Sequence, residues 1–180
     1  MASLSGIIRE NMTFGSGDTV SLSGTVQISE GYTITLGAGS ALLGNSNRIE
    51  VFGTLDISGT SDRLTEVDNL IILQKSTGSV SMSFCHYKGR NLPLNDISNS
   101  VIEMLSWIEH YTTYVELNLS PLSVITGNIF SNANIVVSRD VLTIKSNTFT
   151  GISTIYRISN YGSNETNLEI VGNNFLSTSA

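Results

Sequence analysis

The stretch Ile144-Lys145-Ser146-Asn147-Thr148-Phe149 decides the fold, because its pattern Ile-x-small-Asn-x-Phe recurs at 125–130 and at 170–175. The Asn positions are 19 and 26 residues apart. The stretch 82–87 looks like a degenerate copy with Cys85 in the Asn place, 43 residues before Asn128, which is about two repeats of roughly 22 residues. A repeat of this length is typical of solenoids and propellers. The chain is therefore expected to fold as a stack of similar units.

A second periodicity uses other residues. Short apolar-x-apolar triplets follow one another at separations of 23, 21, 22, 23 and 20 residues. Each triplet is expected to be the strand of one coil, which predicts an all-β chain of about seven coils. The triplets begin at Val26, Ile49, Leu70, Leu92, Val115 and Ile135.

The physics of a coil assigns roles to the repeated residues. Alternate side chains of a strand point to opposite faces, so the Ile and Phe of the pattern are expected inside. Asn tolerates the left-handed backbone that a sharp corner needs, and its amide can bond to an Asn about 4.8 Å away in the next coil. The pattern predicts a structural ladder in which one row of corner residues accompanies one row of stacked rings: Asn128, Asn147 and Asn173 with Phe130, Phe149 and Phe175.

These copies resemble those of the right-handed parallel β-helix proteins, the pectin-lyase-like superfamily of polysaccharide lyases, surface adhesins and phage tailspikes. The stretches 22–36 and 49–55 are similar to the opening coils of many such solenoids. The resemblance implies a single right-handed parallel β-helix, closest in character to the tailspike-like structural β-helices. It implies a fold and not an activity, because one fold supports many functions.

The chain divides into two expected parts. Residues 1–16 are expected to be a short N-terminal arm or cap, in which Ile7 and Ile8 could close the first coil, and residues 17–180 the β-helix domain. The polar run 58–63 is expected to be a loop that projects from a corner. Residues 96–118 allow either a helix or a strand followed by a long turn, and the coil register on both sides favours the strand.

Composition excludes several function classes. The chain has 180 residues with 9 Lys and Arg against 15 Asp and Glu, a net charge of −6, so no nucleic-acid partner is expected. One cysteine and two histidines do not make a zinc set, and neither a metal nor a cofactor is expected. The apolar runs are too short to span a membrane, so no membrane partner is expected.

The aromatic residues Trp107, Tyr111 and Tyr114 form the candidate binding platform. Aromatic rings give a sugar broad contact area, so the three could bind a glycan. Aromatics at such spacing more often complete a core or a subunit interface, and this alternative is favoured.

No catalytic site is expected, since the acidic residues are scattered. A lyase or hydrolase on this fold would need carboxylates converging on one sheet. Glu50, Glu116 and Glu169 occupy the same place in their triplets and would share an outer face, but coils without an acid separate them.

Two other groupings are interpreted as structural. The acids at 56, 62, 66 and 68 match no calcium-binding spacing, and a solvated acidic loop is favoured over a calcium site. Cys85 and His86 are adjacent, so on a strand they point to opposite faces and cannot act as nucleophile and base. Cys85 is expected to be buried.

Together these observations favour a non-enzymatic structural protein. Residues 1–10 lack a basic start and an apolar run, so export by the general route is not expected, although the fold is mostly used outside cells. A virion protein, such as a capsid decoration or cement protein or a small tailspike, resolves this mismatch, and a homotrimer bound to other capsid or tail proteins is expected. The alternatives are an extracellular or cell-surface adhesive module that binds carbohydrate, and a partial polysaccharide lyase or hydrolase.

Overall fold

The computed structural model describes residues 1–91, 96–98, 100–104, 114–117, 123–131, 134–137, 142–150, 154–157 and 168–176. Every regular element in these ranges is a β-strand, and every pairing between named strands is parallel. The expectation of an all-β parallel solenoid is confirmed.

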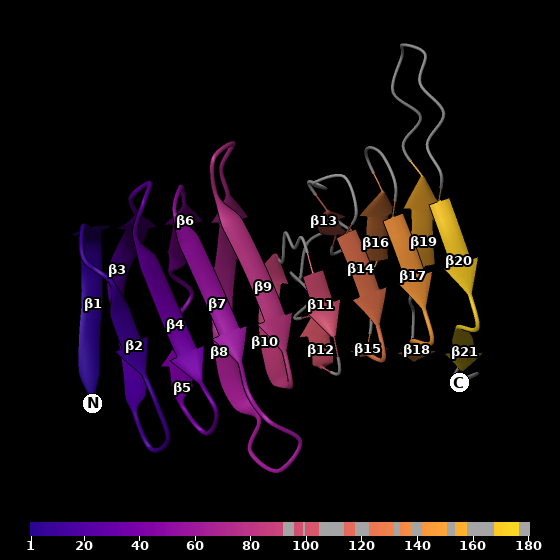
Figure 1. The fold of residues 1–180 in the computed structure, drawn as a ribbon, viewed down its shortest axis with the longest axis horizontal. Helices are drawn as coiled ribbons and strands as arrows, with labels where there is room; N and C mark the ends of the chain where they lie inside the picture. The colour runs from indigo at the N-terminus through magenta and orange to yellow at the C-terminus, as the bar shows by residue number, and fades with distance from the viewer. Residues whose placement is uncertain are drawn as a thin grey trace.

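The strands form three sheets, and each strand pairs with strands of the turns before and after it (Figure 1). The first sheet runs in the order β1 (Ala2–Ile8), β3 (Thr19–Ile28), β5 (Ala41–Leu43), β8 (Thr65–Gln74), β10 (Cys85–Asn91), β12 (Val101–Met104), β15 (Ile129–Ser131), β18 (Thr148–Thr150) and β21 (Asn174–Leu176), and β6 (Arg48–Val51) pairs with β3 and β8. The second runs β2 (Met12–Phe14), β4 (Thr33–Gly37), β7 (Thr54–Ser58), β9 (Ser79–Ser83), β11 (Asp96–Ser98), β14 (Ser123–Thr126), β17 (Leu142–Lys145) and β20 (Leu168–Val171). The third contains β13 (Tyr114–Leu117), β16 (Asn134–Val137) and β19 (Thr154–Arg157).

The solenoid has about five turns that the structure describes continuously, from β1 to β10. Strands of the later residues continue the same two large sheets, but parts of each later turn lie outside the described ranges. The expected total of about seven coils stays a prediction.

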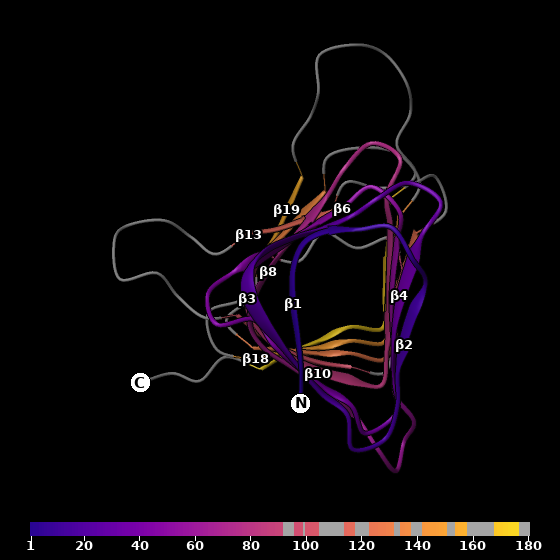
Figure 2. The same cartoon turned by 90° about the vertical axis from the view of Figure 1, so that its left-hand side faces the viewer.

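The core lies between the walls, which superpose when the molecule is viewed along the stack (Figure 2). In β4, β7 and β9 buried and half-buried residues alternate strictly, as they must when one face of a sheet is covered. The inward residues stack in columns, for example Ile34 on Leu55 and Leu55 on Val80. Like-on-like stacking of apolar side chains therefore holds successive turns together.

Residues 2–14, within the expected N-terminal arm or cap, form the first turn of the solenoid. β1 pairs with β3, and β2 pairs with β4, in the same parallel manner as later strands. Leu4 and Ile8 are buried, whereas Ile7 faces outward and is exposed. The first turn itself closes this end of the core.

The register differs from the triplet pattern on both sides of Leu70, which itself pairs with Gly89 and not with a residue 22 positions later. Val26 pairs with Ile49, as the spacing predicted, but Ile49 pairs with Ile72 and not with Leu70. Leu70 and Ile72, the two apolar residues of this triplet, are both buried, so the sequence pattern could not show which of them pairs with Ile49. Val115 and Ile135 pair as predicted, and Ile135 also pairs with Ile155.

The loop and the ambiguous segment were predicted correctly where they are described. Thr60 and Arg63 close a tight exposed turn, with the Thr60 amide donating to the Arg63 carbonyl at 2.9 Å. Residues 96–98, 101–104 and 114–117 are strands and not helix. Residues 105–113 lie outside the described ranges.

Candidate functional site

The three repeated asparagines lie in one column at a corner between two sheets. Asn128 and Asn147 are buried. The Asn128 Nδ2 donates to Asn147 Oδ1 at 3.0 Å, and the Asn147 Nδ2 donates to Asn173 Oδ1 at 3.0 Å. The backbone amides of Asn128 and Asn147 donate to the same two oxygens at 2.9 and 3.0 Å. Each side-chain oxygen thus accepts both a backbone and a side-chain donor of the turn before it.

The phenylalanines stack beside this column. The ring centroids of Phe130 and Phe149 are 5.0 Å apart, and those of Phe149 and Phe175 are 4.7 Å apart, with the planes within 10° of parallel. Phe130 and Phe149 are fully buried. Phe175 differs from the expectation of an inside ring, because it belongs to the last described strand and is 54% exposed.

The column extends beyond the residues that the sequence pattern identified. Ser100 directly precedes Val101, which pairs with His86 and Ile129, the residues that directly follow Cys85 and Asn128. Its Oγ accepts from the Cys85 amide at 3.1 Å, and its own amide donates to Asn128 Oδ1 at 3.0 Å. Ser100 does not match the repeated pattern because a hydroxyl replaces the amide, although the two-repeat distance from Cys85 to Asn128 required a residue there.

The left-handed residue of each corner precedes the Asn. Gly127, Ser146 and Gly172 have φ of 69°, 55° and 63°, and Phe84, which precedes Cys85, has φ of 45°. The idea that Asn itself takes the left-handed conformation is therefore wrong. The small residue of the pattern does so, and this frees the Asn side chain for the hydrogen bonds of the ladder.

Cys85 is buried, as predicted, while the adjacent His86 is half-buried on the outer side. Burial raises the pKa of the Cys85 thiol well above its usual range, and the Glu66 carboxylate raises it further. The His86 Nδ1 lies 3.2 Å from Glu66 Oε2 on the neighbouring strand. The thiol is placed as a core residue and not as a nucleophile.

The candidate aromatic platform falls largely outside the described residues. Trp107 and Tyr111 lie in 105–113, and Tyr114 begins β13 without a described side chain. Their role at an interface or with a glycan stays a prediction.

Glu50 and Glu169 do not share a face, contrary to expectation, because Glu50 lies on β6 of the first sheet and Glu169 on β20 of the second. Glu116 lies on β13 of the third sheet, and a face shared by Glu50 and Glu116 stays a prediction. The triplets look alike in sequence because inward apolar and outward polar residues alternate in the same way along the strands of every wall of a solenoid.

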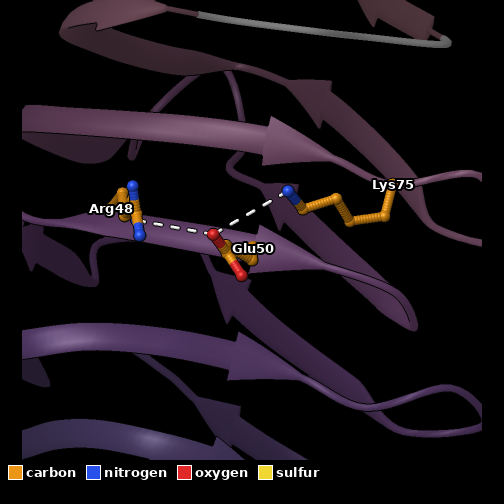
Figure 3. A network of polar contacts seen from close by, with 3 residues as sticks. All are labelled: Arg48, Glu50 and Lys75. Carbon is orange, nitrogen blue, oxygen red and sulfur yellow. Dashed lines mark ion pairs between the residues drawn. The ribbon is translucent and has the colours of Figure 1, made fainter.

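Glu50 is held by two cations on the outer surface (Figure 3). Its Oε1 lies 3.4 Å from Arg48 Nε and 3.8 Å from Lys75 Nζ, and the Lys75 ammonium is 6.0 Å from the centre of the Phe52 ring. Exposed pairs of this kind contribute little to stability, commonly about 0–1 kcal/mol each. The arrangement neutralises the carboxylate locally.

Of the four acids of the expected acidic loop, only Asp62 lies in a loop, because Asp56 lies on β7 and Glu66 and Asp68 lie on β8. Three of them have separate partners. Asp56 accepts from the Ser81 hydroxyl at 2.9 Å, Asp62 accepts from Ser61 at 3.3 Å, and Glu66 contacts His86. Within the described ranges, no group of three His, Cys, Asp or Glu side chains could hold a metal ion.

Among the residues that the structure describes, there is no helix of the length and apolarity needed for a membrane span. Comparisons of the chain with family models, with curated proteins and with solved structures found no match.

Proposed function

We propose that the chain is a non-enzymatic structural protein, a right-handed parallel β-helix similar to the tailspike-like proteins, which assembles as a homotrimer in a virion. Its partners are other capsid or tail proteins, to which it adds as a decoration or cement protein. The observation that carries the proposal is that the polar side chains in question bond to groups of the same chain. Buried polar side chains hydrogen-bond between turns, and the half-buried carboxylates of Glu50 and Asp56 contact cations or hydroxyls of the same chain.

Substrate turnover by acid–base catalysis needs carboxylates that converge on one bond. Glu50 instead lies between Arg48 and Lys75, and Asp56 accepts hydrogen bonds from Ser58 and Ser81. This use of charge supports a scaffold and not a catalyst.

The outer face of the first sheet supports side-by-side association. Ile7 on β1 and Ile129 on β15 are both exposed, but they lie on different parts of this sheet. Ile7 pairs with Gln27 in line with β6, and Ile129 pairs with Val101 and Thr148 in line with β10. Three rods packed around a threefold axis would bury such residues and form a closed assembly. The trimer interface is therefore proposed on the part of the sheet that contains β12, β15 and β18, together with the segment from Trp107 to Tyr114.

Light scattering coupled to size exclusion tests the assembly. The expected mass is about three times the 19.3 kDa of one chain. An Ile129→Asp variant should shift the mass toward the monomer, whereas Thr126→Asp, on the outer face of the second sheet, should not. A stable mass of one chain at micromolar concentration for the unaltered protein would contradict the trimer.

The virion assignment has its own test. Antibody detection of the chain in purified particles, at a stoichiometry in multiples of three, is the expected result. Recovery of the chain alone from a secreted fraction, with retention on immobilised glycans, would favour the adhesive module instead.

A further inference from the structure

The second sheet has an outer face made almost entirely of hydroxyl side chains. Inward and outward residues alternate along β4, β7 and β9, and Met12 and Phe14 of β2 pack against the core, so the residues between them point outward. We call this surface the hydroxyl face. Its residues are Thr13 on β2, Thr33, Thr35 and Gly37 on β4, Thr54, Asp56 and Ser58 on β7, and Ser79, Ser81 and Ser83 on β9.

The hydroxyl face is a regular array. Parallel pairing aligns its residues in columns, of which one contains Thr33, Thr54 and Ser79 and the next contains Thr13, Thr35, Asp56 and Ser81. Equivalent side chains repeat about every 4.8 Å from strand to strand and about every 6.6 Å along one strand. The strands of this sheet lie behind one another along the straight right-hand wall of Figure 2, where β2 and β4 are labelled. Backbone pairing therefore fixes the spacing of the array in two directions.

Five hydroxyls of this face make no hydrogen bond within the part of the chain that the structure describes. They belong to Thr13, Thr33, Thr35, Thr54 and Ser83. Because threonine is restricted about χ1, little side-chain entropy is lost when its hydroxyl is ordered by a ligand. The face thus presents hydrogen-bonding groups that are already in position.

The hydroxyl face lacks the groups that bind other common partners. Its residues include no cation, no aromatic ring and no large aliphatic side chain, which are the groups that bind anions, sugars and proteins respectively. Its one carboxylate, that of Asp56, accepts hydrogen bonds from Ser81 at 2.9 Å and from Ser58 at 3.5 Å. The ligand that fits is therefore uncharged, periodic and able to bond to hydroxyls.

The strand spacing is close to a distance that water adopts in ice. Each oxygen in ice bonds tetrahedrally to four others, and two hydrogen bonds of about 2.8 Å that meet at such an oxygen place the outer two oxygens about 4.6 Å apart. Equivalent hydroxyls in a column, such as those of Thr33 and Thr54, repeat about every 4.8 Å. One water can thus bridge each neighbouring pair with nearly the geometry of ice.

We propose that the hydroxyl face binds ice. Each column of hydroxyls holds a row of bridging waters, and these rows join the surface lattice of an ice crystal. Burial of the methyl groups of the threonines adds hydrophobic free energy. The activity goes beyond the proposed function, and the trimer leaves the face free, because its interface is proposed on β12, β15 and β18 of the first sheet.

The freezing temperature of a solution that contains a seed crystal of ice tests the proposal. The full chain is expected to lower the freezing temperature below the melting temperature, by a difference that rises with protein concentration. Thr35→Lys places a long charged side chain in the middle of the array and should abolish the difference. Thr25→Lys is the matched control, because Thr25 is exposed on β3, outside the second sheet, and this variant should keep the full difference.

Uptake into ice is a second measurement, and it needs no variant. Slowly growing ice excludes solutes that do not bind to it, so the unaltered chain should be enriched in the ice and depleted from the liquid, as measured by absorbance. Circular dichroism and urea unfolding show whether the two Lys variants keep the fold of the parent.

Three results would overturn the proposal. They are equal freezing and melting temperatures together with exclusion of the unaltered chain from ice, equal activity of Thr35→Lys and the unaltered protein, and retention of the chain on a neutral polysaccharide without an effect on ice growth. The last result would show that the hydroxyl face binds a glycan instead.

Discussion

Replacing Phe149 with alanine removes the middle ring of a three-ring stack. The side chain is 1% exposed and lies 5.0 Å from the Phe130 ring and 4.7 Å from the Phe175 ring. Full burial of such a side chain contributes about 1.5–3 kcal/mol, and each stacked pair adds about 0.5–1.5 kcal/mol. The expected loss in the free energy of unfolding is therefore about 3–5 kcal/mol, the range for buried Phe→Ala changes.

Urea unfolding, followed by both circular dichroism and tyrosine fluorescence, measures this loss. Phe175→Ala is the matched control, because the same ring makes one stacked contact and is half exposed, so its cost should be less than half as large. A loss below about 1 kcal/mol for Phe149→Ala, or equal losses for the two variants, would refute the reasoning that stacking between turns stabilises the fold.

Three further predictions concern the ladder, the thiol and catalysis. Asn147→Leu removes an acceptor from the two Asn128 donors and a donor from the Ile125 carbonyl, so it should cost about 2–4 kcal/mol. Asn173→Leu removes the equivalent partners of Asn147 and Ile144 at a less buried position and should cost somewhat less, and a loss below about 1 kcal/mol for Asn147→Leu in urea unfolding would argue against the ladder. Cys85 should not react with a thiol reagent at pH 8 until the protein is unfolded. Because burial raises the pKa of this thiol in the folded state, stability should be full below the unfolded pKa of about 8.5 and fall as the pH rises above it; rapid labelling of the native protein would contradict this. Incubation with acidic and neutral polysaccharides should yield no new reducing or unsaturated ends, and turnover that disappears on one Asp or Glu substitution would overturn the structural assignment.

The sequence alone predicts the parallel solenoid because the fold repeats its chemistry. The Ile-x-small-Asn-x-Phe copies require stacked corners and stacked rings, and the structure contains both hydrogen-bonded asparagines and parallel rings at those positions. Even a degenerate copy is informative, since Cys85 lies in the same column.

Sequence periodicity is less informative about which residues pair between turns and about which wall of the solenoid a residue belongs to. A strand period of two cannot separate Leu70 from Ile72, because both are inward, and it cannot assign Glu50 and Glu169 to different walls. A residue pattern also does not show that two different side chains can accept the same hydrogen bond. Ser100 was missed for this reason, although its hydroxyl accepts from a backbone amide as an Asn oxygen does.

The column formed by Cys85, Ser100, Asn128, Asn147 and Asn173 allows successive turns to contain different numbers of residues. Successive members from Cys85 to Asn173 are 15, 28, 19 and 26 residues apart, yet each donates to the next at about the same distance. The rise from one layer to the next is thus set by backbone pairing at the column, and the perimeter of a layer is free to vary. Extra residues form loops that project from the corners, as at 60–64 between β7 and β8. Peptide epitopes grafted between Thr60 and Arg63 should therefore be displayed on the surface without changing the order or phase of the layers.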